Sequence, residues 1–243
     1  MIAVILAAGM ASRLRPLTDH SPKCLLKVGG GRSLLQRTVD ALLDAGMTEL
    51  VVVTGYRGEM IEDFLARQYP SLAVHLIDNP DYQTTNNIYS LYLAKPCVEG
   101  REFTLLDSDI LFDPAILPLV MQPSGSTIAV NRHELGEEEM KVVTDAEGHI
   151  VEISKTCDPS LAAGESVGIE KISATYSRAL FAELDDMMCD EALRNTFYEL
   201  AFQRLIAKGH SFRIIDTTAV FSMELDTVDD FTHAQSLIPS HIF

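Results

Sequence analysis

The chain has 243 residues and a formal net charge of −16 at pH 7, with 47% apolar and 22% charged residues. These proportions are typical of a globular protein of one large domain or two small ones, and no apolar run reaches the roughly 18 residues of a membrane-spanning helix. We expect neither a nucleic acid nor an anionic membrane as partner, because both require a basic face.

The cysteines indicate a reducing environment. Cys24, Cys97, Cys157 and Cys189 are scattered along the chain without a C-x-x-C pair, so we expect neither a zinc site nor a disulfide framework. The apolar run at residues 2–8 lacks the basic start and the length of a secretory signal. We therefore expect a cytoplasmic protein.

The first predicted element is a strand over residues 2–8, an unbroken apolar run typical of a strand that is buried on both faces. It ends at Gly9 in a loop of small residues, which lets a ligand approach the backbone and its anion-binding N–H groups. Four cations follow closely: Arg13, Arg15, Lys23 and Lys27. This local concentration indicates a polyphosphate site, although a turn with solvated cations fits the spacing equally well.

Helices and strands then alternate. We expect helices at residues 33–45 and 58–68 and strands at residues 50–54, 73–77 and 103–106. This β-α-β order predicts an α/β fold with a doubly wound, mostly parallel (Rossmann-like) sheet and helices on both faces. The loops after its strands should share one edge, where ligands bind.

Polar residues follow two of these strands. Asn86 and Asn87 begin a short predicted helix; asparagines at that place are usually caps, although a side-chain amide can also bind a base edge. Asp107 and Asp109 follow the fourth strand, where residues two apart project to the same side. They form either a solvated turn or, beside a triphosphate, a site for Mg²⁺, which takes one or two carboxylates.

The pattern changes in the second half of the chain. After a strand at residues 126–131, three strands separated by turns are expected at residues 140–144, 149–154 and 166–174. The remaining predicted elements are helices at residues 177–189 and 196–208, strands at residues 212–216 and 219–226, and a final helix from Val228. We expect one domain over residues 1–243, with an inserted antiparallel lobe at about residues 137–176.

The order of short motifs resembles a known family. L-A-A-G-x-x-S-R-L, R-P-L-T and S-P-K-x-L-L, all within residues 6–26, resemble the signature of nucleotidyltransferases that activate sugar phosphates and small phosphorylated alcohols. N-N-x-Y-S-L at residues 86–91 resembles the branch that uses CTP with phosphocholine or 2-aminoethylphosphonate. The P-loop pattern and G-x-G-x-x-G are both absent from the sequence.

The resemblance, which spans nearly the whole chain, implies a reaction. Such enzymes condense a nucleoside triphosphate with a phosphorylated acceptor and release pyrophosphate. We therefore expect transfer of CMP from CTP to 2-aminoethylphosphonate or phosphocholine, with Mg²⁺ as cofactor. Because the attacking oxygen is already anionic, the site must chiefly position the reactants and neutralise their charge.

The resemblance also implies roles for residues. Those expected to bind the nucleotide are Leu6, Ala7, Ala8, Gly9, Arg13, Lys23, Asn86, Asn87 and Asp107. Among them Arg13 and Lys23 are the catalytic cations, on the leaving phosphates and between the α-phosphate and the acceptor, respectively. Asp109 and the aspartate of E-L-D-T, Asp226, match the metal ligands. The acceptor-binding candidates are Ser90, Lys141, Lys155 and Glu165; the two lysines are equally compatible with ordinary surface positions.

The identity of the acceptor stays open. A quaternary ammonium favours an aromatic cage, yet the chain has no Trp and offers only tyrosines: Tyr82, Tyr89, Tyr92, Tyr176 and Tyr198. A primary amine can be held by a carboxylate such as Glu165, which favours 2-aminoethylphosphonate. The alternatives are a sugar-1-phosphate nucleotidyltransferase, a molybdenum-cofactor nucleotidyltransferase and a non-catalytic nucleotide-binding regulatory module. A homodimer is one possible assembly.

Overall fold

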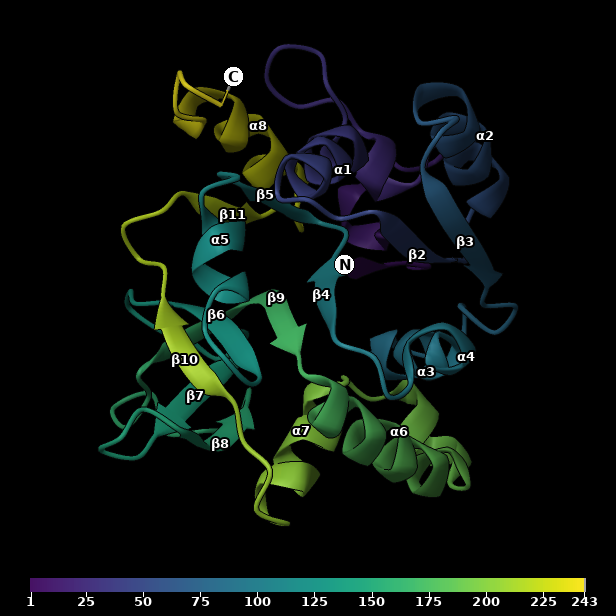
Figure 1. The fold of residues 1–243 in the computed structure, drawn as a ribbon. Helices are drawn as coiled ribbons and strands as arrows, with labels where there is room; N and C mark the ends of the chain where they lie inside the picture. Colours follow the sequence, from purple (N-terminus) through teal and green to yellow (C-terminus); the bar gives the residue numbers. More distant parts are fainter. Residues whose placement is uncertain (243) are drawn as a thin grey trace.

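A parallel sheet runs through the middle of the protein in the computed structural model, which describes residues 1–242 (Figure 1). The main path of the sheet has the order β10-β6-β9-β4-β1-β2-β3. Its parallel part consists of β1 (Ile2–Ala7), β2 (Glu49–Thr54), β3 (Ala73–Asp78) and β4 (Phe103–Asp107). Strand β1 pairs in parallel with both β2 and β4, which confirms the predicted α/β fold.

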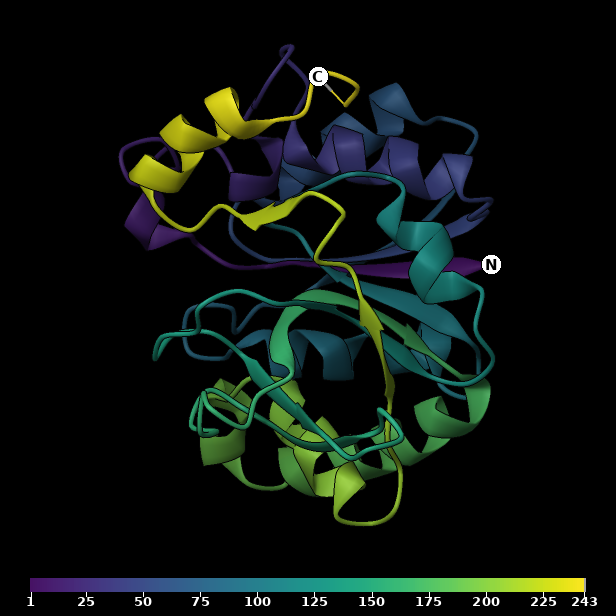
Figure 2. The same ribbon diagram turned by 90° about the vertical axis from the view of Figure 1, so that its left-hand side faces the viewer.

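The helices lie on both faces of this sheet (Figures 1 and 2). They are α1 (Leu34–Asp44), α2 (Gly58–Gln68), α3 (Asn87–Leu93), α4 (Lys95–Val98), α5 (Ile116–Met121), α6 (Ala174–Met188), α7 (Glu199–Ile206) and α8 (Val228–Leu237). Helix α1 begins after Ser33, whose hydroxyl accepts a hydrogen bond from Gln36 N, and it is followed by Gly46 with φ 84°. A residue with positive φ at this place ends a helix at little cost only if it is glycine.

The core explains why β1 is an unbroken apolar run. Successive side chains of a strand point to opposite faces. Ile2, Val4 and Leu6 accordingly pack in the cluster that includes α3, α6 and α7. Ala3 and Ile5 pack in the cluster that includes α1, α2 and α5. Since each fully buried large aliphatic side chain contributes about 1.5–3 kcal/mol, both layers hold the strand in place.

The second half of the chain extends the sheet with five further strands, which pair antiparallel except at the outer edge, where the last of them lies parallel to its neighbour. They are β6 (Thr127–Asn131), β7 (Lys141–Thr144), β8 (Ile150–Ser154), β9 (Gly164–Ile172) and β10 (Arg213–Asp216). Strand β9 lies antiparallel between β4 and β6, and β7 pairs with both β8 and β9. A separate two-stranded sheet joins β5 (Ile110–Phe112) to β11 (Ser222–Glu224).

Helix α7 begins later than the sequence pattern predicts. Its first residue is Glu199, whereas the predicted helix begins at residue 196. The Thr196 hydroxyl donates to the carbonyl of Leu193 instead of capping the helix. The amide of Tyr198 donates to Asn87 Oδ1, 3.0 Å away. This contact across 111 residues anchors the start of α7 beside α3, so Glu199 occupies the first turn of the helix.

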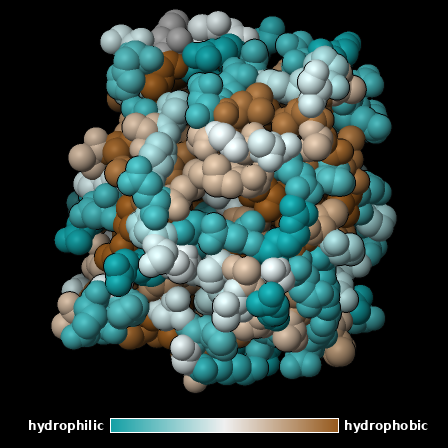
Figure 3. Space-filling view, in the orientation of Figure 1, coloured by the Kyte–Doolittle hydropathy of each residue, from teal (hydrophilic) through white to brown (hydrophobic). Residues whose placement is uncertain are grey.

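The structure bears on two expectations drawn from composition, those on membrane-spanning helices and on the cysteines. Within residues 1–242 no helix is both long and apolar enough to cross a membrane. Figure 3 shows hydrophilic residues interspersed with smaller apolar patches on the face seen in Figure 1. The four cysteines are unpaired, and Cys24 and Cys157 are buried.

Candidate active site

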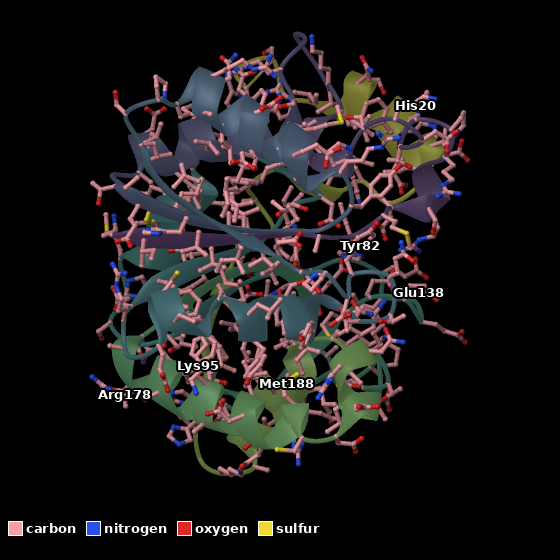
Figure 4. All side chains as sticks on the ribbon, turned by 90° about the vertical axis from the view of Figure 1, so that its right-hand side faces the viewer. His20, Tyr82, Lys95, Glu138, Arg178 and Met188 are labelled. Atoms are coloured by element: carbon pink, nitrogen blue, oxygen red, sulfur yellow. The ribbon has the colours of Figure 1, made fainter. Side chains whose placement is uncertain are left out.

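A cavity of about 630 Å³ lies at the carboxyl ends of the central strands. In Figure 4 two of its lining residues, Tyr82 and Glu138, lie at the same end of the molecule although they come from distant parts of the chain. The lining residues that the sequence analysis had singled out are Leu6, Ala8, Gly9, Arg13, Lys23, Asn86, Asn87, Ser90, Asp107, Asp109, Lys155, Glu165 and Asp226. Ala7 and Lys141 are not among the lining residues.

Lys23 connects the first loop to two distant carboxylates. Its Nζ donates to Asp109 Oδ2 at 3.0 Å and to Asp226 Oδ1 at 2.6 Å. Arg13, which is largely exposed, also pairs with Asp226. Burial opposes protonation of Lys23, but the two carboxylates outweigh it and raise its pKa. The ammonium group is therefore charged and fixed at the base of the cavity.

The β5–β11 pair brings Asp109 and Asp226 together. Glu224 lies opposite Ile110 in the antiparallel register, and the amide of Leu225 donates to the carbonyl of Asp109. Asp226 directly precedes Thr227, whose side chain caps α8. A strand pair on one side and a helix start on the other thus fix the position of the Asp226 carboxylate.

Asp109, Glu224 and Asp226 form a group of carboxylates. One oxygen from each lies within 4.8 Å of the others. Burial of the carboxyl group and the charges of Asp109 and Asp226 raise the pKa of Glu224 to about 8, although its side chain keeps contact with solvent. Burial acts against ionisation of Asp226 too, but Lys23 and Arg13 lower its pKa. Carboxylate oxygens gathered in this way are the kind of ligand that fits a divalent cation such as Mg²⁺.

Asn86 and Asn87 combine the two roles considered from the sequence. Asn86 Oδ1 accepts from the amide of Asn87 and caps α3, and Asn87 Oδ1 holds the start of α7. Both residues also line the cavity, and none of the hydrogen bonds described for residues 1–242 uses a side-chain nitrogen of either one. Their amide groups therefore keep donors for a ligand after their oxygens have been used in the fold.

Ser90 comes from the same segment as the two asparagines. Its hydroxyl accepts from Asn79 Nδ2 at 3.2 Å. It is distant in the chain from Lys155, which follows β8, and from Glu165, which lies on β9. We therefore expect Ser90 to lie near the bound nucleotide, together with Asn86 and Asn87.

Two of the predicted acceptor residues come from the antiparallel segment: Lys155 follows β8 and Glu165 lies on β9. Lys155 Nζ is 4.8 Å from the centre of the Phe197 ring and 3.5 Å from Glu138 Oε2. Glu165 contacts His133 Nε2 at 2.7 Å. Burial raises the pKa of Glu165, and the contact with His133 opposes that rise. Lys155 thus has only a long contact to an exposed carboxylate, whereas Glu165 has a close partner.

Lys141 has a different position from the one expected. It is buried, and its Nζ donates to the carbonyl oxygens of Glu137, Glu139 and Lys155 at 3.4, 3.2 and 2.6 Å. With three carbonyl partners and no place in the cavity wall, the ammonium group supports the surrounding backbone. Lys141 therefore does not contact an acceptor directly. Its hydrogen bonds hold the segment that brings Glu138 and Glu139 into the cavity wall.

The inner wall of the cavity is strongly acidic. The Tyr198 hydroxyl is 3.1 Å from Asp107 Oδ2 and 3.3 Å from Glu170 Oε1. Burial, reinforced by the neighbouring acidic groups, raises the pKa of Asp107 and of Glu170 well above the usual range. Burial likewise raises the pKa of Glu199 to about 7. Asp107 and Glu199 line the cavity directly.

Glu224, Phe197 and Glu199 are among the lining residues that the sequence analysis missed. Glu224 stands in the quoted E-L-D-T motif, where its alternation with Asp226 on a strand was the available signal. Phe197 and Glu199 gave no signal, because their segment reads as an ordinary helix start. Of the five tyrosines considered for a cage, only Tyr82 lines the cavity.

Comparison with known proteins places this geometry in a family. Residues 3–202 match the family described as the MobA-like NTP transferase domain. The chain belongs to this family. The resemblance that the motifs indicate is thereby confirmed, and the activity class of the family is nucleotidyl transfer.

Similar proteins of this nucleotidyltransferase family carry names that concern cytidylyl transfer. The chain is 30% identical to the CMP-5'-(3-aminopropyl)phosphonate synthase of Streptomyces rubellomurinus over 242 aligned residues. This alignment covers 94% of the chain and 37% of the synthase. It is 29% identical to the 2-aminoethylphosphonate cytidylyltransferase of Lancefieldella rimae, over 86% of the chain and 79% of that protein. The chain spans between 37% and 51% of the length of the first curated relatives it matches.

A solved structure shares the fold. The CTP:phosphocholine cytidylyltransferase of Streptococcus pneumoniae superimposes with a TM-score of 0.79, at 22% identity, over 98% of the chain and 99% of that protein. At this identity the likeness concerns the fold. It agrees with the mixed sheet and the antiparallel strands β7 to β9 described above.

Proposed function

We propose that this chain is a Mg²⁺-dependent cytidylyltransferase that transfers CMP from CTP to a small aminoalkylphosphonate and releases pyrophosphate. The observation that carries the proposal is the position of Lys23, whose Nζ is 3.0 Å from Asp109 and 2.6 Å from Asp226 inside one cavity. Nucleotidyl transfer brings several anions together, and it depends on cations and metal-binding carboxylates placed in this way. The names of the relatives support CTP and an amine-bearing acceptor.

The reaction needs charge neutralisation more than proton transfer. An anionic oxygen of the acceptor attacks the α-phosphorus of CTP, and the bond from that phosphorus to the bridging oxygen of pyrophosphate breaks. We assign Lys23 to the α-phosphate and the attacking oxygen because it is buried at the base of the cavity, and Arg13 to the departing phosphates because it lies at the exposed rim. Asp109 and Asp226 would hold Mg²⁺, which would supply further neutralisation of phosphate charge.

The base is assigned to the asparagine segment. Cytosine presents two acceptors, O2 and N3, to a side-chain amide. The unused amide nitrogens of Asn86 and Asn87 are donors of the matching kind, and both residues line the cavity. The small residues Ala8 and Gly9 after β1 leave room for the nucleotide backbone; a Cβ added at Gly9 would meet nothing within 4 Å.

The acceptor is assigned to the part of the cavity that is lined by Lys155, Phe197 and Glu199. Lys155 is a cation suited to a phosphonate or phosphate group, and the acidic inner wall is suited to an amine. Phosphocholine is a second candidate because Phe197, which lines the cavity and is 40% exposed, offers an aromatic face to a quaternary ammonium. Phe197 is a single phenylalanine, and the acidic wall beside it favours the primary amine.

Pyrophosphate release tests the proposal. The protein is assayed with CTP and Mg²⁺ against 2-aminoethylphosphonate, phosphocholine, phosphoethanolamine, glucose 1-phosphate and mannose 1-phosphate. We expect the highest kcat/KM with 2-aminoethylphosphonate. Turnover confined to the sugar phosphates would show that the protein is a sugar-1-phosphate nucleotidyltransferase. CTP binding without turnover would indicate a regulatory module. A panel of nucleoside triphosphates checks the base.

A further inference from the structure

One carboxylate in the cavity wall has no partner. Glu199 is 6% exposed and lines the cavity, and its Oε2 is fully buried without a hydrogen bond. No ion pair among residues 1–242 includes this side chain. An unpaired buried oxygen of an acidic group is costly in a folded protein. Such an atom on a residue that lines a binding cavity points to a ligand as the source of the missing donor.

The other acidic side chains of the cavity have contacts of their own or, in the case of Glu224, belong to the carboxylate group that fits Mg²⁺. Asp109 and Asp226 bind Lys23, and Glu165 contacts His133. Asp107 accepts from the Tyr198 hydroxyl. Glu165, the residue that the sequence favoured for an amine, is therefore a weaker candidate than Glu199.

The fold accounts for the position of Glu199 but leaves its oxygen unpaired. Glu199 is the first residue of α7, and the N-terminus of a helix tolerates a negative charge. Lys155 lies near enough to favour its ionised form, but no contact within 4.0 Å joins the two described side chains. Asp107 and Glu170 nearby are both linked to Tyr198, and neither supplies a positive charge. The surroundings therefore leave Glu199 without a cation.

We propose that Glu199 binds the ammonium group of the acceptor through Oε2, so that the acceptor lies with its phosphonate toward Lys155 and its amine toward the acidic inner wall. This inference rests on the proposed function and extends it to the basis of acceptor choice. A primary ammonium brings three N–H donors, whereas a quaternary ammonium brings none. An oxygen that lacks a donor therefore selects a primary amine over choline.

Paired acceptors test this assignment. In n-propylphosphonate a methyl group replaces the ammonium of 2-aminoethylphosphonate at nearly the same size. A hydrogen bond to a charged group is worth a factor of about 10 to 150, so the wild-type protein should prefer 2-aminoethylphosphonate by that ratio of kcat/KM. In Glu199→Gln the ratio should fall toward one, while the Kd for CTP, measured by calorimetry, checks that the site is folded.

Two controls locate the effect. Glu191→Gln makes the same change at an exposed position in the helical turn before α7, and its ratio should equal that of the wild type. Glu165→Gln tests the competing carboxylate. If Glu199→Gln does not fold, Glu199→Asp retracts the carboxylate by one methylene and should lose more kcat/KM with 2-aminoethylphosphonate than with n-propylphosphonate.

The outcomes separate this inference from the proposed function. Equal use of both acceptors by the wild-type protein overturns the role of Glu199, as does an unchanged ratio in Glu199→Gln. Loss of the ratio in Glu165→Gln alone assigns the amine to Glu165 instead. The absence of pyrophosphate release from the wild-type protein with every acceptor defeats the proposed function itself.

Discussion

Replacing Lys23 with alanine removes the ammonium group that bridges Asp109 and Asp226. Removing one partner of a buried ion pair costs about 3–5 kcal/mol, and we expect the lower end because the two aspartate side chains keep 26% and 28% exposure. For a chain of this size about 3 kcal/mol corresponds to a decrease of roughly 6–12 °C in Tm. The loss of a charge partner of the transition state costs a further factor of about 10²–10³ in kcat.

The two effects of Lys23→Ala respond differently to Mg²⁺. A divalent cation between the carboxylates replaces the missing positive charge in the folded protein, so Mg²⁺ should raise the Tm of the variant more than that of the wild type. It does not restore a cation at the α-phosphate, so kcat should stay low. Thermal unfolding with EDTA or Mg²⁺ and pyrophosphate release at saturating CTP and acceptor measure both quantities.

Lys27→Ala is the matched control, because Lys27 is exposed, belongs to the same segment and does not line the cavity. We expect wild-type Tm and kcat for this variant. A folded Lys23→Ala protein with nearly full kcat would refute the assignment of Lys23 to the reacting phosphates. An unchanged Tm without Mg²⁺ would show that the contacts to the aspartates add little stability.

Four further predictions follow from individual contacts. Asp109→Asn should shift the Mg²⁺ titration of activity to higher concentration; an unchanged titration would remove Asp109 from the metal site. Gly168→Ala should lower both Tm and kcat, because Gly168 has φ +74° and an added Cβ would lie 2.8 Å from Asp107 Oδ2. Lys141→Met should raise the KM for the acceptor several-fold more than the KM for CTP; equal changes would contradict a role confined to the acceptor side. Because the pKa of Glu199 is raised to about 7 by burial, its contribution to the free energy of unfolding decreases as the pH rises from the unfolded value near 4.5 through 7. Glu199→Gln should therefore raise Tm more at pH 8 than at pH 5, and an equal gain at both would refute the shift.

Local pattern was sufficient to predict the parallel half of the fold. The run at residues 2–8 is apolar at every position because alternate side chains enter two different core clusters, and that double burial can be read from composition. The start of α7 could not be predicted in the same way. Thr196 and Glu199 satisfy the local rule for a helix start, but the contact between Asn87 and Tyr198 joins residues 111 positions apart and decides the outcome.

In the candidate site, too, some residues could be identified from the sequence and others only from the structure. Lys23, Asp109 and Asp226 stood out because their motifs are specific, and the structure brings the three side chains into contact; their catalytic roles stay predictions. Lys141 was considered for the acceptor because a sequence gives the charge of a residue without its depth. Glu199 escaped notice because the feature that singles it out, an oxygen without a partner, exists only after folding.

The β5–β11 pair has a consequence for folding during synthesis of the chain. Lys23 and Asp226 are 203 positions apart, while β1 to β4 are complete by residue 107. Since domains acquire structure as the chain leaves the ribosome, a nascent chain can order its parallel strands well before residues 222–226 have been made. In such an intermediate Lys23 has one of its two carboxylate partners, Asp109, and lacks the second. We therefore expect the capacity for nucleotidyl transfer to arise abruptly, with the synthesis of the last strand.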